Sequence, residues 1–289
     1  MNALIRTARP KQWTKNVLVF AAPGAAGVLD EPKQLGLTCL AFVAMCLASS
    51  GTYYWNDAMD VESDRAHPTK RFRPIASGSV SIRMAHVVGT LLIVGALGVA
   101  ATTGRWQTVA VVATYLAVTL TYSAIWKHIA VVDLVAIASG FVLRAAAGAV
   151  AVDVPMSSWF VLCITFGSLF IVTGKRFAES RELGEDARTL RSTLGEYSEG
   201  FLRFVLALAC GGALVSYCMW AFERRDLVDA QNHFYELSIV PMLIALLRYL
   251  LILEQGHGGA PEEVFAADRS LQAFGVIWLI TFALGVYVG

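Results

Sequence analysis

The sequence contains few charged residues. Only 16% of its 289 residues are Asp, Glu, Lys or Arg, whereas 56% are hydrophobic. Such a composition excludes a disordered chain and is atypical of a soluble enzyme. The charged residues gather in a few clusters that long apolar stretches separate. We therefore expect a protein that lies in a membrane.

Cysteine motifs and linkers are also lacking. The five cysteines all fall in apolar stretches, and none has the CxxC or Cys/His spacing of a zinc site. No disulfide framework is implied. No Pro- or Ser-rich linker and no low-complexity run divides the chain. We therefore expect one domain over residues 1–289, with functional loops near 57–83 and 175–200.

Apolar stretches of span length recur along the chain. About 20 mostly apolar residues are needed for a helix to cross about 30 Å of hydrocarbon. The stretches are continuous runs of Leu, Val, Ala and Ile, not the alternating segments of a β-barrel. The sequence therefore predicts an all-α polytopic membrane protein with nine transmembrane helices. The predicted spans are 14–30, 35–56, 84–103, 107–126, 129–151, 157–174, 201–222, 237–254 and 271–288.

Lys and Arg are distributed unequally between alternate connections. Seventeen of the 23 lie at the N-terminus or in connections on the same side, four lie on the other side, and Arg144 and Arg248 lie within spans. Because basic residues are enriched on the cytoplasmic side, we expect the N-terminus and both charged loops in the cytoplasm. Nine crossings then place the C-terminus outside.

An acidic cluster follows the second predicted span. Asp57, Asp60 and Asp64 stand at i, i+3 and i+7, so their carboxylates share one face if the helix continues. A divalent cation between them would relieve their repulsion, and Mg²⁺ characteristically bridges carboxylates to phosphate oxygens. The alternative is a solvated acidic helix end, balanced by the basic residues that follow. We favour the metal site because the cluster lies at the mouth of a span.

These residues carry a resemblance to a known family. Asn56 and the three aspartates form NDxxDxxxD at 56–64, and HPxKRxRPIASG follows at 67–78. Together they resemble the first aspartate-rich motif of the UbiA-type intramembrane prenyltransferase superfamily. The resemblance implies nine helices around a cytoplasm-facing cavity, with Mg²⁺ holding a diphosphate. Tyr122 and Lys127 are similar to a Tyr/Lys element of the superfamily, although Lys127 also suits an interfacial anchor.

The second motif of the superfamily is missing. Where most members have DxxxD after the sixth span, this chain mixes basic and acidic residues from Lys175 onward, including Arg176 and Glu179. This departure, with RPKQWTKN at 9–16, resembles the branch that transfers 5-phosphoribose from phosphoribosyl diphosphate to decaprenyl phosphate. The product is a lipid-linked pentose donor for cell-wall arabinan.

The substrates that this resemblance implies are strongly anionic. Phosphoribosyl diphosphate and a lipid monophosphate together carry roughly six or seven negative charges near neutrality. Such a load requires cations in addition to Mg²⁺, because guanidinium and ammonium groups pair with phosphate. The expected substrate-binding residues are Lys15, Asn16, Lys70, Arg71, Arg73, Tyr122, Lys127, Asp133, Arg144, Lys175, Arg176 and Glu179.

Two of these residues lie in the fifth predicted span. Arg144 is about halfway along it, where an unpaired charge costs a few kcal/mol or more. We expect it to face the substrate or an internal partner and not to snorkel to the surface. Asp133, near the cytoplasmic end, would contact the ribose hydroxyls or hold a lysine, or would be a helix N-terminal charge.

The resemblance implies a mechanism with Asp57, Asp60, Asp64 and Asn56 as the catalytic group and the three aspartates as Mg²⁺ ligands. Departure of diphosphate would let the lipid phosphate attack the anomeric carbon with inversion. A polyprenyl diphosphate transferase with an aromatic acceptor is the alternative, favoured if Glu179, Glu182 and Asp186 formed a second metal cluster. A transporter of phosphorylated metabolites is a third possibility. We expect no nucleic-acid partner, and a homo-oligomer is left open.

Overall fold

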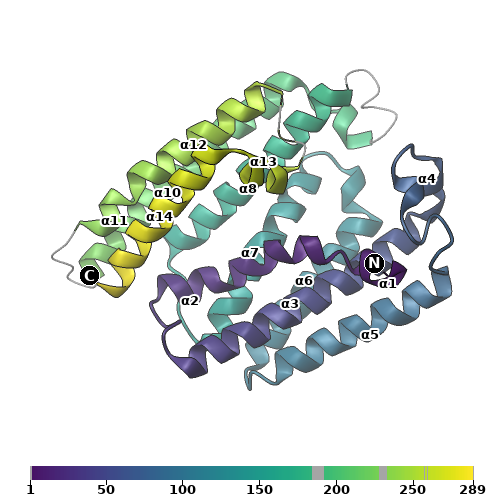
Figure 1. The fold of residues 1–289 in the computed structure, drawn as a ribbon, viewed down its shortest axis with the longest axis horizontal. Coiled ribbons are helices and arrows are strands. Elements are labelled where there is room, and N and C mark those ends of the chain that lie inside the picture. The colour runs from purple at the N-terminus through teal and green to yellow at the C-terminus, as the bar shows by residue number, and fades with distance from the viewer. Residues whose placement is uncertain (1, 184–191, 228–232, 257, 259, 289) are drawn as a thin grey trace. The chain divides into compact units, whose positions relative to one another are not determined.

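The structure is a computed structural model that describes residues 2–183, 192–227, 233–256, 258 and 260–288, and these residues contain helices but no strands. Figure 1 shows the arrangement. The elements are α1 (Ala3–Ala8), η1 (Pro10–Phe20), α2 (Ala21–Ala25), α3 (Pro32–Met59), α4 (Val61–Ala66), η2 (Lys70–Phe72), α5 (Ile82–Ala101), α6 (Trp106–Ala124), η3 (Trp126–His128), α7 (Val132–Val152), α8 (Ser158–Leu183), η5 (Ser192–Gly195), α10 (Glu199–Leu227), α11 (Phe234–Leu237), α12 (Ile239–Glu254), α13 (Pro261–Ala267) and α14 (Arg269–Tyr287).

Eight helical segments in the described part of the chain are long and apolar enough to cross a membrane. They are α3, α5, α6, α7, α8, α10, the α11–α12 pair and α14. Each coincides with one of the expected spans, so the all-α polytopic fold is confirmed. The count of nine is not.

The remaining expected span, 14–30, has a different local structure. Its residues belong to the 3-10 helix η1, the short helix α2 and the turn that follows. Gly27 adopts a φ of 72°, which ends the helical stretch after Ala25. A single α-helix of span length is therefore not formed here, because the regular structure is divided between two helix types.

Helix α8 extends farther than the hydropathy pattern indicates. The expected span ended at 174, whereas the helix continues to Leu183. The added turns contain Lys175, Arg176 and Glu179, which favour helix although they are polar. The first part of the expected 175–200 loop is therefore a helical extension.

Internal contacts divide the chain into two compact units. Unit 1 comprises Met1–Ile129 with Gly140–Pro155, and unit 2 comprises Ala130–Ser139 with Met156–Gly289. Helix α7 contributes its first residues to unit 2 and the remainder to unit 1. The single domain expected from the sequence stays a prediction.

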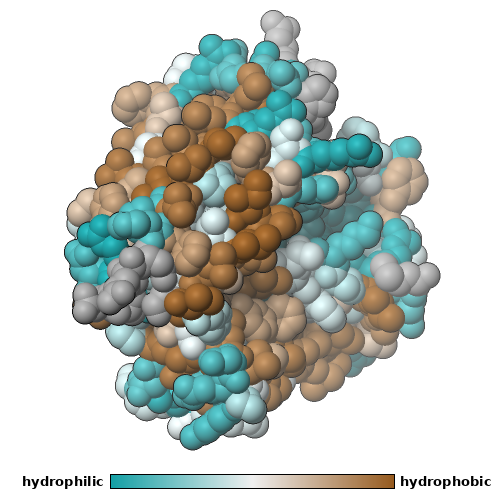
Figure 2. Space-filling view, turned by 60° about the vertical axis from the view of Figure 1, so that its left-hand side comes forward, coloured by the Kyte–Doolittle hydropathy of each residue, from teal (hydrophilic) through white to brown (hydrophobic). Residues whose placement is uncertain are grey.

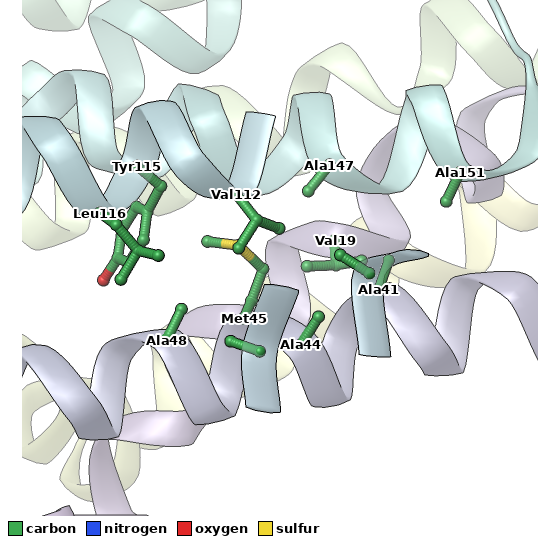
Figure 3. Packing of buried hydrophobic residues seen from close by; sticks show 12 residues of the cluster. Val19, Ala41, Ala44, Met45, Ala48, Val112, Tyr115, Leu116, Ala147 and Ala151 are labelled. Carbon is green, nitrogen blue, oxygen red and sulfur yellow. The ribbon is translucent and has the colours of Figure 1, made fainter. Parts of the chain in front are cut away.

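The core of unit 1 consists largely of small side chains. Ala41, Ala44 and Ala48 lie along one face of α3, at the spacing that lets membrane helices approach closely. Val112 of α6 and Ala147 of α7 contribute to the same cluster, which Figure 3 shows around Val19 and Met45. The N-terminal segment η1 is thus part of the core of this unit.

Unit 2 is built around α8 and α10, with α11, α12 and α14 packed against α10 or against one another. Aromatic rings fill much of it. Trp220 of α10 stacks on Phe282 of α14 at a centroid distance of 5.6 Å, and it meets Tyr235 of α11 edge-on at 5.9 Å. Large rings therefore take the place that alanines have in unit 1.

Hydrophobic side chains also cover much of the surface. Leu91 and Val94 of α5 are exposed, as are Phe204 and Val215 of α10. On the face shown in Figure 2, hydrophobic residues form broad continuous areas, and hydrophilic residues gather toward the margins. Exposed apolar areas of this kind are typical of a surface that contacts lipid.

Candidate functional site

The aspartates of the predicted motif lie where α3 gives way to α4. Asp57 is in the last turn of α3, Asp60 stands between the helices with a φ of −91° and a ψ of 7°, and Asp64 is in α4. The helix is therefore interrupted at Asp60 and does not run on as expected. Asp57 and Asp64 are buried, and Asp60 is half-buried.

Each of the three carboxylates is paired with a cation of unit 1. Asp57 Oδ1 accepts from Arg9 Nη2 at 2.6 Å and from Arg73 Nη1 at 3.2 Å. The same Arg73 nitrogen lies 2.8 Å from Asp64 Oδ2. Lys127 Nζ, which follows α6, lies 2.5 Å from Asp60 Oδ1. Three negative charges therefore meet three positive charges in one cluster, which we call the aspartate–cation cluster.

Arg9 is the member of this cluster that the sequence analysis did not select. It follows α1 in a left-handed conformation, with a φ of 51° and a ψ of 60°, and it precedes Pro10. That conformation costs about 1–2 kcal/mol for a residue with a side chain. Its guanidinium also lies over the Tyr53 ring at 4.7 Å. The signal was present in the motif RPKQWTKN, but its contact with Asp57 spans 48 positions.

Hydrogen bonds between the N-terminal segment and α3 hold Arg9 in place. Tyr54 Oη donates to the carbonyl of Leu4 at 2.7 Å, and Ser50 Oγ donates to the carbonyl of Ala8 at 3.1 Å. Trp13 Nε1 donates to the same Ser50 oxygen at 3.0 Å. The segment on both sides of Arg9 is therefore fixed against the helix that carries Asp57.

The other expected residues around this cluster have different surroundings. Arg71 is exposed and lies over the Phe72 ring, whereas Lys70 is half-buried in η2. Asn56, Tyr122 and Lys15 are also half-buried, in α3, α6 and η1. Arg73, from the same 67–78 motif, contacts Asp57 and Asp64.

His67, which opens the same loop, acts as a hydrogen-bond acceptor. Its Nδ1 accepts from the backbone N–H of Thr69 at 3.3 Å and of Lys70 at 3.4 Å. Burial and the charge of Lys70 lower the pKa of His67 below its usual value. A neutral imidazole suits this role, because a protonated Nδ1 could not accept.

Arg144 lies inside unit 1 and is surrounded by neutral acceptors. Its Nε donates to Asn16 Oδ1 at 2.8 Å, Nη1 to the carbonyl of Gly140 at 2.8 Å, and Nη2 to Tyr115 Oη at 2.9 Å. Its Cζ lies 4.8 Å from the centre of the Tyr115 ring. Arg144 and Asn16 are both buried. They are thus brought together by internal hydrogen bonds, and a contact of either residue with substrate stays a prediction.

The remaining expected residues form a cluster in unit 2. Asp133, at the start of α7, accepts from Arg176 Nε of α8 at 3.3 Å and from the Tyr197 hydroxyl. Arg176 Nη1 also donates to Glu179 at 2.8 Å, and Lys175 Nζ lies 3.7 Å from Glu179. Asp133 is fully buried. Both of its oxygens are engaged, by an arginine and a tyrosine. It also lies in the first turn of α7, as the helix N-terminal alternative expected, and a contact with ribose hydroxyls stays a prediction.

Tyr197 is a second residue that sequence reasoning missed. Its hydroxyl accepts from the backbone N–H of Val131 at 2.6 Å while it donates to Asp133. Val131 has a φ of 68°, which is unusual for a β-branched residue. Burial and the bond to Asp133 raise the pKa of Tyr197 above its usual value. The hydroxyl therefore stays protonated and fixes a strained residue at the start of α7.

The aspartate–cation cluster contains carboxylate oxygens that suit Mg²⁺, although these oxygens are paired with Arg9, Arg73 and Lys127. Carboxylate oxygens are the ligands that Mg²⁺ prefers, and Asp57 and Asp64 meet at one nitrogen of Arg73. Within the described residues, no three His, Cys, Asp or Glu side chains are grouped as a metal site. The three-carboxylate ligand set therefore stays a prediction that requires the cations to give up their partners. Asp186 lies outside the described residues, as does the side chain of Glu182.

The span-length helices and the charged cluster at the end of α3 together define a polytopic helical membrane protein with a charged site at a helix end. Residues 17–271 match the UbiA prenyltransferase family. The chain belongs to this family, and it is an integral membrane protein.

Known proteins are similar to this chain over nearly all of its length. A decaprenyl-phosphate phosphoribosyltransferase of Mycolicibacterium smegmatis is 43% identical, covering 99% of this chain and 93% of that protein. One of Corynebacterium glutamicum is 40% identical, covering 99% and 87%. Among solved structures, a UbiA homologue from Archaeoglobus fulgidus bound to GPP and Mg²⁺ has a TM-score of 0.73 at 17% identity, with 99% of each chain covered. That likeness confirms the UbiA fold.

Proposed function

We propose that this protein is a phosphoribosyltransferase that moves 5-phosphoribose from phosphoribosyl diphosphate to a polyprenyl phosphate, decaprenyl phosphate in particular. Diphosphate is released, and the product serves as a lipid-linked pentose donor for the cell wall. The observation that carries this proposal is the identity of 40–43% over 99% of the chain with relatives named decaprenyl-phosphate phosphoribosyltransferase.

The aspartate–cation cluster supports the same reaction. Asp57, Asp60 and Asp64 would hold Mg²⁺, which when bound neutralises charge on a leaving diphosphate. Arg9, Arg73 and Lys127 lie at these carboxylates. They would pair with phosphate oxygens, since a guanidinium binds phosphate bidentately and an ammonium binds it as a point charge.

The acceptor needs alignment more than activation. A lipid phosphate is already anionic at neutral pH, so no general base is required for its attack on the anomeric carbon. The chain's task is to fix the phosphate opposite the leaving group and to exclude water. Arg144 is our candidate within unit 1 for steering an anionic group, because its guanidinium is held by neutral oxygens.

We also propose that the N-terminus and the charged loops face the cytoplasm, at the plasma membrane. The excess of Lys and Arg in these connections supports that orientation. Phosphoribosyl diphosphate is strongly anionic and does not cross a bilayer unaided, so the active site would have to face the side on which this donor is made. An active site on that side would therefore meet its donor directly.

A transfer assay with purified protein in detergent tests the proposal. The protein is given phosphoribosyl diphosphate labelled in the ribose, decaprenyl phosphate and Mg²⁺, and label in the lipid extract is measured. We expect ribose label to enter the lipid, and chelation of Mg²⁺ with EDTA to stop it. Prenyl label that instead moved from a prenyl diphosphate to 4-hydroxybenzoate would overturn it. A transporter would show no turnover without a second compartment.

A further inference from the structure

The aspartate–cation cluster is electrically balanced before any ligand arrives. Arg9 and Arg73 neutralise Asp57, Arg73 also contacts Asp64, and Lys127 neutralises Asp60. The carboxylates of Asp57 and Asp64 are 2–4% exposed, so water screens these pairs weakly. A metal ion that approached alone would have to displace a cation from each carboxylate.

From this balance we infer that the cluster takes up Mg²⁺ together with a diphosphate and excludes the free ion, with Arg73 as the residue that enforces the order. The inference rests on the proposed function, because it assumes that these carboxylates are the metal ligands. The cations paired with these carboxylates would oppose binding of the free metal ion.

Free Mg²⁺ and a Mg²⁺–diphosphate complex change the charge of the cluster differently. Free Mg²⁺ adds two positive charges to a neutral cluster and leaves the displaced Arg73 without an anion. A Mg²⁺–diphosphate complex supplies both partners at once, since the metal takes the carboxylates and the phosphate oxygens take the guanidinium. The exchange conserves the number of ion pairs, and a bidentate guanidinium–phosphate pair is at least as favourable as the pair that it replaces.

Arg73 is better suited to this role than its neighbours. A single nitrogen, Nη1, contacts both Asp57 and Asp64. One displacement therefore frees Asp64 and removes one of the two guanidinium partners of Asp57, which Arg9 still contacts. Its side chain is 27% exposed, whereas the aspartates are buried, which gives the guanidinium a route outward. Arg65, in α4, donates to the carbonyl of Ala76 at 3.1 Å and is exposed. It offers a matched control with the same charge.

The inference is tested by measuring the binding of Mn²⁺ alone to the purified full chain with electron paramagnetic resonance. This measurement does not depend on enzymatic activity. We expect weak binding to the wild type and at least about tenfold tighter binding when inorganic diphosphate is added. Arg73→Gln should bind free Mn²⁺ at least about tenfold more tightly than the wild type. An adjacent guanidinium lowers the proton affinity of a carboxylate by about one to three decades, and a divalent cation meets the same repulsion. Adding Asp57→Asn to Arg73→Gln should abolish that gain.

Arg65→Gln is the control and should bind free Mn²⁺ as the wild type does. Equal affinities of Arg73→Gln and Arg65→Gln would overturn the inference, and so would wild-type protein that binds free Mn²⁺ as tightly as with diphosphate. Should Arg73→Gln fail to fold, Lys127→Gln frees Asp60 and tests the same expectation. Failure of the proposed function looks different: ribose label would not enter the lipid extract in the transfer assay, whatever the affinity for Mn²⁺.

Discussion

At the scale of single residues, buried charge in this protein is held by specific partners. Asp57 lies between Arg9 and Arg73, whereas Asp133 lies between Arg176 and Tyr197. Breaking a buried pair by removing one partner is expensive because the other charge remains. A substitution at one of these positions can therefore lower activity by destabilising the fold. A matched control variant is needed to separate a catalytic role from a structural one.

Asp57→Asn should reduce transfer of ribose label by about a hundredfold or more, because a carboxylate that anchors a metal–diphosphate acts where charge develops. The amide keeps the shape and can still accept from Arg9, so the protein should remain folded. Glu62→Gln, an exposed change in α4, is the control and should retain near wild-type transfer. A folded Asp57→Asn protein with a rate close to that of Glu62→Gln would contradict the role of Asp57.

Tyr197→Phe should destabilise the protein by about 1–3 kcal/mol, because Val131 N–H and Asp133 each lose a buried partner. Tyr249→Phe is the matched control. The Tyr249 hydroxyl is buried and has no hydrogen-bond partner among the described residues, so its removal should be neutral or stabilising. Melting temperatures of the two variants in detergent measure the difference, and equal melting temperatures would contradict the assigned role of Tyr197.

The same hydroxyl predicts a pH dependence. Because the folded protein raises the pKa of Tyr197, its contribution to stability is complete below the ordinary phenol value of about 10 and is lost as the pH rises through the raised value. The melting-temperature advantage of the wild type over Tyr197→Phe should be constant at neutral pH and should shrink only in strong alkali. An advantage that already disappeared near neutrality would exclude this account.

At the scale of elements, close backbone approach fixes the position of η1 against α7. A Cβ added to Gly148 would lie 1.7 Å from the carbonyl oxygen of Val19 and 2.7 Å from its carbonyl carbon. Both are backbone atoms, so a side chain here forces one element away from the other. Gly98 of α5 has nothing within 4 Å of the same hypothetical Cβ.

Gly148→Ala should therefore destabilise the protein by about 3 kcal/mol or more, or prevent its accumulation, since overpacking against backbone is poorly relieved. Gly98→Ala should stabilise α5 by about 0.5–1 kcal/mol, because alanine loses less conformational entropy in a helix. Yield and melting temperature of the two variants provide the comparison. A fully stable Gly148→Ala protein would mean that η1 does not pack as described.

The helices could be predicted from the sequence more completely than the site. Apolar runs of span length give α5, α6 and α14 within a few residues, because lipid exposure demands continuous hydrophobicity. A polar helical segment has no continuous apolar run, so the extension of α8 through Arg176 was not predicted. The 3-10 structure of η1 was not predicted either. Motif spacing indicated the aspartates, but not their partners. The pairs of Asp60 with Lys127 and of Asp133 with Tyr197 join residues 67 and 64 positions apart.

At the scale of the whole molecule, the number of crossings decides where the C-terminus lies. Eight span-length helices are defined within the described residues, and the segment Pro10–Ala25 is a further helical stretch of mixed type. If this stretch crosses as well, the two ends lie on opposite sides of the membrane. The orientation inferred from Lys and Arg then places the N-terminus inside.

Alkaline phosphatase is active only outside the cytoplasm, whereas green fluorescent protein does not fluoresce when the general secretory route exports it. We therefore expect a fusion after Gly289 to be active with alkaline phosphatase and not to fluoresce with green fluorescent protein. The same reporters fused after Ala66, beside the aspartate–cation cluster, should give the opposite pattern and act as the internal control. Seven of the span-length helices lie between Ala66 and Gly289, so the two fusions should differ in either case. With the N-terminus inside, the reversed pattern, with Ala66 outside and Gly289 inside, would show that the segment at 14–30 does not cross.

The neutral surroundings of Arg144 bear on how the chain enters the membrane during synthesis. Its side-chain partners Asn16 and Tyr115 belong to η1 and α6, both of which precede α7 in the chain. When the ribosome delivers α7, every group that solvates its arginine has already been made. The helix therefore need never face lipid with a bare positive charge, provided that the earlier segments wait beside the insertion machinery.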